Sequence, residues 1–138
     1  MQKTIMNKKV AIKIMFFLLG TILIFHLLIF TEQIPYDKVW AGRLNSVEEM
    51  KSFETFSILI NIFMVLVLLL KYKLLKSGKT NKAIDILIWV FVVFFALNTI
   101  GNMFTKSLIE LILGGILTLV SSILCFIIVK KEKIKTAQ

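Results

Sequence analysis

Long runs of apolar residues, separated by short lysine-rich segments, constrain this chain more than any other feature. Four such runs cover about residues 10–30, 53–70, 83–101 and 108–129. A helix rises about 1.5 Å per residue, so roughly 20 apolar residues cross the ~30 Å hydrocarbon core of a bilayer. The pattern predicts an all-α integral membrane protein, in which residues 1–138 form a single transmembrane domain built as an antiparallel four-helix bundle.

Composition and charge point to the bilayer as the main partner. The chain is 58% apolar and only 18% charged, whereas about a quarter of the residues of a soluble domain are charged. A net charge of +9 suits either nucleic acid or a membrane surface. The lysines flank the apolar runs, so we expect no nucleic acid partner. Arg43 is the only arginine, and the abundance of isoleucine and phenylalanine favours a bacterial source with an AT-rich genome.

The lysines also predict the orientation of the bundle. Three segments of the chain hold thirteen of the 17 basic residues: Lys3, Lys8, Lys9, Lys13, Lys71, Lys73, Lys76, Lys79, Lys82, Lys130, Lys131, Lys133 and Lys135. The alternate segments hold only Lys38, Arg43, Lys51 and Lys106. Short cytoplasmic loops carry the excess of Lys and Arg. We therefore expect a multi-pass protein of the plasma membrane with both flanks in the cytoplasm (N-in/C-in), and the bias disfavours insertion in both directions.

Residues 31–52 form the longest connection, which this orientation places outside the cell. It contains Trp40, a residue typical of the membrane interface. The sequence Ser46-Val47-Glu48-Glu49 is a capping box, in which a serine side chain and a glutamate three residues later satisfy free N–H groups at a helix start. The second helix should therefore begin near Val47, before the apolar run itself.

Polar residues recur at helical spacing within three of the runs. The stripes are Glu54, Ser57 and Asn61 in the second run, Asn98 and Asn102 in the third, and Glu110, Gly114, Thr118, Ser121 and Cys125 in the fourth. Polar groups inside a membrane are costly and usually face the interior of a bundle or a water-filled cavity. The strongly polar members all lie in the expected outer half, which predicts an outward-opening polar pocket.

This pocket is a hypothesis for the binding of a lipid-like or small-molecule ligand. Its walls and lid would be formed by Glu54, Asn61, Asn98, Asn102 and Glu110, with Trp40 and Arg43 of the external loop above them. A purely structural interpretation stays open beside it. Small residues allow helices to approach closely and asparagines bond across helices, while the two carboxylates could pair with Lys106 or Arg43.

Several other chemistries find no support in the sequence. The single cysteine, Cys125, excludes an intrachain disulfide, and the chain has no Cys/His cluster for a metal and no glycine-rich phosphate loop. His26 stands alone in the first run, which is more typical of a bonded interhelical donor than of a functional group. We therefore predict no metal, no cofactor and no catalytic residue.

Three functions remain compatible with the sequence. The first is a non-enzymatic accessory protein that binds a ligand or a membrane-protein partner through the outer pocket. The second is a small transporter or channel subunit, which would need a second copy or more to build a pathway. The third is an intramembrane enzyme acting on a lipid-like substrate. A continuous polar path to the cytoplasm would favour transport, and a closed cavity with two nearby carboxylates would favour an enzyme.

Overall fold

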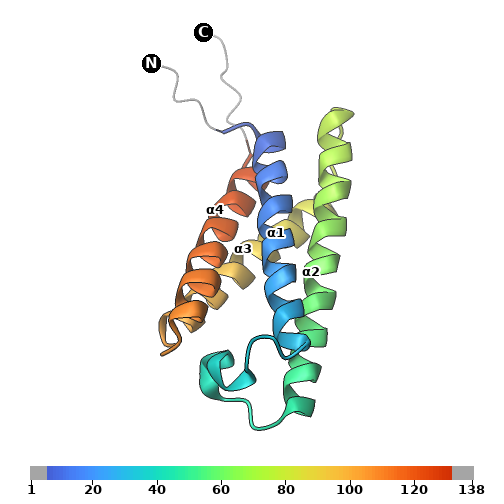
Figure 1. Ribbon diagram of the computed structural model, residues 1–138. Helices are drawn as coiled ribbons and strands as arrows, with labels where there is room; N and C mark the ends of the chain where they lie inside the picture. Colours follow the sequence, from blue (N-terminus) through green and yellow to red (C-terminus); the bar gives the residue numbers. More distant parts are fainter. Residues whose placement is uncertain (1–5, 132–138) are drawn as a thin grey trace.

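The computed structural model describes residues 6–131. Its elements in chain order are α1 (Lys8–Phe30), the 3-10 helices η1 (Tyr36–Lys38) and η2 (Trp40–Gly42), α2 (Val47–Lys76), α3 (Lys82–Met103), the π-helix η3 (Glu110–Ile116) and α4 (Leu117–Val129) (Figure 1). Counting η3 with α4, residues 6–131 contain four helices long and apolar enough to cross a membrane. The all-helical class is confirmed, and these helices are those of a multi-pass membrane protein. Three basic residues of the flanks, Lys3, Lys133 and Lys135, lie outside the described range.

Local sequence signals explain where α2 begins and ends. The Ser46 Oγ accepts from the Glu49 N–H at 3.1 Å, so the predicted start at Val47 is confirmed. The Glu49 carboxylate reaches back to the Asn45 N–H at 2.9 Å, one residue further than a capping box requires. At the other end Gly78 adopts a left-handed backbone with φ of 65°, which a glycine accepts without steric cost.

The helices are held together by two separate apolar clusters. The larger fills the half of the bundle where α1 begins and α4 ends, and its most buried members include Ile12, Met15, Leu68, Ile88 and Ile128. At that end the Lys8 Nζ donates to the Lys130 carbonyl at 2.6 Å. Figure 1 shows α1 and α4 close together there and apart at the opposite end.

The smaller cluster anchors the connection between α1 and α2. It consists of Ile29, Val39, Leu44 and Met50, so side chains from both helices pack against the loop. This packing holds residues 31–46 against the open end of the bundle (Figure 1). The core is therefore discontinuous, with one cluster at each end.

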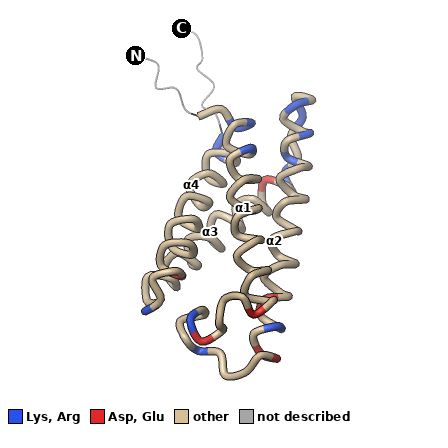
Figure 2. The backbone as a smooth tube through the Cα atoms, in the orientation of Figure 1, with Lys and Arg blue, Asp and Glu red and all other residues tan. Residues whose placement is uncertain are grey.

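Charged residues divide between the two ends of the molecule. Figure 2 shows lysines gathered where α1 begins and α2 ends, and most acidic residues at the end that carries the loop. Asp85 is an acidic residue at the lysine-rich end, and it lies 2.5 Å from the Nζ of the buried Lys71. This contact joins α2 to α3, so Lys71 has a structural role in addition to its place in the basic loop.

Candidate functional site

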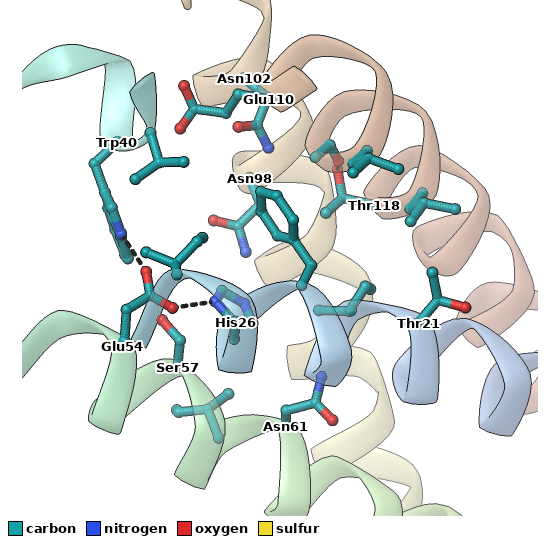
Figure 3. Close-up of a pocket in the computed structure, with 18 of the residues that line it drawn as sticks. Thr21, His26, Trp40, Glu54, Ser57, Asn61, Asn98, Asn102, Glu110 and Thr118 are labelled. Carbon is teal, nitrogen blue, oxygen red and sulfur yellow. Dashed lines mark hydrogen bonds and ion pairs between the residues drawn. The ribbon is translucent and has the colours of Figure 1, made fainter. Parts of the chain in front are cut away.

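A cavity of about 490 Å³ lies between the two apolar clusters. Its walls come from α1, α2, α3, η3 with α4, and the loop. Six of the seven residues singled out from the sequence line it: Trp40, Glu54, Asn61, Asn98, Asn102 and Glu110 (Figure 3). The seventh, Arg43, is exposed and does not line the cavity. The loop therefore covers the cavity with Ile34, Val39 and Trp40, not with an arginine.

Glu54 is the most enclosed polar group of the cavity wall, with 0% of its surface exposed. The Trp40 indole N–H donates to its Oε1 at 2.7 Å, and the His26 Nδ1 lies 2.6 Å from its Oε2. Figure 3 shows the carboxylate between these two partners, one from the loop and one from α1. A buried carboxylate is tolerable only with such partners.

Glu110 binds the same loop from the opposite wall. It is the first residue of η3 and is 9% exposed. The Ala41 N–H donates to both carboxylate oxygens, at 3.2 and 3.0 Å, and the Thr105 hydroxyl donates to Oε2. Within residues 6–131, neither Glu54 nor Glu110 forms an ion pair with Arg43 or Lys106. The pairing considered from the sequence is thus replaced by bonds to the loop.

Two adjacent loop residues therefore form hydrogen bonds to opposite walls of the cavity, Trp40 to Glu54 and Ala41 to Glu110. Trp40 and Ala41 both adopt left-handed backbone conformations, with φ of 53° and 55°. This conformation costs a residue other than glycine roughly 1–2 kcal/mol, so the bonds to Glu54 and Glu110 hold it in place. We call residues 31–46 the cap, because this segment closes the cavity at its polar end.

Other polar residues of the stripes differ in whether they have a hydrogen-bond partner. At the α3–α4 contact, the hydroxyls of Thr99 and Thr118 bond to each other at 2.9 Å, and the Ser122 Oγ donates to the Val92 carbonyl at 2.9 Å. These bonds support the structural interpretation of the polar stripe in the fourth apolar run, in which its residues serve helix packing. Asn61 differs from them, because it is 4% exposed in the cavity wall and its Oδ1 has no hydrogen-bond partner within the described residues.

Gly114 explains how Asn102 fits beside the fourth helix. A Cβ added at Gly114 would lie 2.7 Å from the Asn102 side-chain amide. The glycine therefore allows the amide to lie against η3 at the cavity wall. The sequence correctly placed Gly114 on a helix–helix contact, but gave no sign that an asparagine occupies the space.

Apolar side chains form most of the remaining wall and extend to the outside of the bundle. Ile24 of α1 and Phe56 of α2 both line the cavity and are each 61% exposed. Both side chains therefore belong to the cavity wall and also to the exposed apolar surface of the helices. An amphipathic molecule could place a polar group inside and an apolar chain beside these side chains.

His26 lines the cavity, which the sequence did not predict, whereas its contact with Glu54 of another helix agrees with the expected role as a bonded interhelical group. It lies on α1, which carries no polar stripe, and only the packing of α1 against α2 brings its ring to Glu54. The sequence could have suggested this contact only through position along the helices. His26 lies near the end of α1 and Glu54 near the start of α2, so consecutive antiparallel helices would bring them to a similar depth.

Comparison of the chain with protein-family models, with curated proteins and with solved structures finds no match. Within residues 6–131, no group of three or more His, Cys, Asp or Glu side chains could hold a metal ion. Function is therefore inferred from the cavity and its chemistry.

Proposed function

We propose that this protein binds a lipid-like, amphipathic ligand in the cavity beneath the cap, and that it acts as a small accessory protein of the plasma membrane. One observation supports this most strongly. A cavity of about 490 Å³ combines apolar walls that reach the lipid-facing surface with polar groups near the cap. Ligand sites typically have 300–1,000 Å³, mostly apolar walls and a few placed polar groups.

The proposal includes an orientation: an antiparallel bundle with both flanks in the cytoplasm and the cap outside the cell. The thirteen basic residues on the cytoplasmic side against four on the other support it, as does the separation of charge in Figure 2. In this orientation the cavity lies in the outer half of the bilayer. The ligand would then come from the outer leaflet.

A transport pathway through one copy has less support. The larger apolar cluster fills the bundle between the cavity and the lysine-rich end. A polar solute would have to cross this packed layer, which buried apolar side chains make costly. Transport would therefore need a second copy or a membrane-protein partner, whereas binding in the cavity needs neither.

The second candidate is an intramembrane enzyme, and the His26–Glu54 contact at 2.6 Å favours it. A carboxylate that orients an imidazole is a common arrangement for a general base. Its weakness is that both carboxylates are already bonded to the cap. Conversion of a bound amphiphile by the native protein, but not by the variant His26→Gln, would favour the enzyme.

The binding proposal can be tested by filling the cavity. Asn98 lines it, whereas the preceding residue, Leu97, is 63% exposed on the outside of α3. The variant Asn98→Phe therefore adds an aromatic ring inside the cavity, and Leu97→Phe adds the same ring on the outer surface of α3. Native mass spectrometry of protein extracted from membranes should find amphiphiles retained by the native protein and by Leu97→Phe, and lost from Asn98→Phe. Equal retention by both variants would contradict the proposal.

A further inference from the structure

The Asn61 amide is a buried polar group in the cavity wall, well below the cap. Asn61 lies seven residues beyond Glu54 on α2, which corresponds to about 10 Å along the helix axis. Its Oδ1 is buried and has no hydrogen-bond partner within residues 6–131. A buried amide without a partner is unfavourable. The Asn61 side chain nevertheless lines the cavity, so its amide group is available to bond to a ligand there.

The charges around the cavity restrict the ligand further. Within the described residues, no lysine or arginine lines the cavity, and its histidine, His26, already contacts Glu54, so no free basic group is available to balance a phosphate or a carboxylate. Its two acidic residues, Glu54 and Glu110, already accept hydrogen bonds from the cap. An anionic head group would be buried without a counter-charge, and a cationic one would have to compete with the cap for the carboxylates.

We infer that the ligand is an uncharged amphiphile whose head group carries hydroxyls, and that one hydroxyl bonds to the Asn61 side-chain amide. This inference rests on the proposed function and specifies its ligand class. Asn98 and Asn102 line the cavity between Asn61 and the cap and offer both donors and acceptors to further hydroxyls. The apolar chain leaves the cavity beside Ile24 or Phe56.

Two probes that share one chain test the ligand class. 1-Oleoylglycerol has two free hydroxyls, and 1-oleoyl-lysophosphatidate is the same molecule with a phosphate on one of them. Oleylamine supplies a cation on a similar chain. In an amine-oxide detergent, which has no hydroxyls of its own, native mass spectrometry should give the glycerol probe a Kd at least about ten-fold below those of both charged probes.

Substitution of Asn61 tests the contact itself. Asn61→Leu should weaken binding of 1-oleoylglycerol roughly three- to ten-fold, the effect of one lost hydrogen bond. The melting temperature of the ligand-free protein should stay the same or rise, because an unpaired buried polar group is removed. Ser121→Ala is the matched control, since the Ser121 Oγ is also buried and without a partner but does not line the cavity. It should leave binding unchanged.

The outcomes separate this inference from the proposed function. Equal or tighter binding of the lysophosphatidate or of oleylamine overturns the uncharged class, although the cavity still binds an amphiphile. Unchanged binding by Asn61→Leu overturns the contact, and Asn61→Ala provides the same test if leucine prevents folding. Failure of all three probes to bind the native protein contradicts the proposed function as well.

Discussion

At the scale of single residues, Glu54 should contribute to stability through its two buried partners. Replacement by glutamine keeps the size of the side chain but removes the charge that His26 and Trp40 both contact. Because hydrogen bonds to a charged group contribute more than neutral ones, we expect Glu54→Gln to lower the free energy of unfolding by about 1–3 kcal/mol. The melting temperature in detergent measures the effect.

The control for this substitution lies on the same helix. Glu48 is exposed in the first turn of α2, so Glu48→Gln should change the melting temperature little. If both variants melt like the native protein, Glu54 is solvated and its contacts to the cap do not stabilise the fold.

Single residues also show where sequence reasoning reached its limit. Helical spacing placed Glu54 and Asn61 on one face, because period alone determines which positions share a face. It could not identify Glu54 as the partner of His26, because the two residues belong to different helices. It also could not predict the bonds from Trp40 and Ala41 to the carboxylates, because neither residue is one that usually adopts a left-handed backbone.

At the scale of elements, the glycine pair of η3 allows a prediction with an internal control. A Cβ at Gly114 would lie 2.7 Å from the Asn102 amide, whereas a Cβ at Gly115 would meet nothing closer than 3.8 Å. Gly114→Ala should displace Asn102 and lower the free energy of unfolding by roughly 1–2 kcal/mol. Gly115→Ala should be neutral or raise it by up to about 1 kcal/mol, because alanine favours helix.

Thermal unfolding of the two variants in the same detergent compares them directly. A loss of stability in Gly115→Ala equal to that in Gly114→Ala would show that the backbone of η3, not the contact with Asn102, limits substitution. If Gly114→Ala weakens ligand binding and Gly115→Ala does not, the contact between Gly114 and Asn102 also shapes the cavity.

The elements differ in how well the sequence predicted them. The start of α2 followed from the capping box, and the apolar runs located each membrane helix. The π-helix η3 was not predicted, since the same residues fit an α-helix and only adjacent glycines hint at a local irregularity. Lys106, considered as a partner for the carboxylates, lies beyond the end of α3 at Met103.

At the scale of the whole molecule, the distribution of lysines predicts a topology that labelling can test. Gln33 in the cap and Thr80 in the connection between α2 and α3 are both exposed. In intact cells, an impermeant thiol reagent should modify Gln33→Cys and spare Thr80→Cys. The native Cys125 is buried and should remain unlabelled. The reverse pattern would contradict the orientation, and equal labelling would indicate insertion in both directions.

The overall arrangement was only partly predictable from the sequence. Hydropathy predicts membrane-spanning helices because burial in lipid is a property of each segment. The cavity depends instead on two apolar clusters that leave space between them, one formed by the helices and the other by Ile29, Val39, Leu44 and Met50 with the cap. That division depends on how helices tilt and pack against one another, which no single segment encodes.

An experimental structure of the protein in a lipid bilayer tests the central claim most directly. We expect elongated, ligand-like density beneath the cap, with its polar end near Asn61 and its chain leaving beside Ile24 or Phe56. Glu54 and Glu110 should still bind Trp40 and Ala41. A cavity filled by side chains, or Glu54, Asn98 and Glu110 turned to different sides of the bundle, would contradict it.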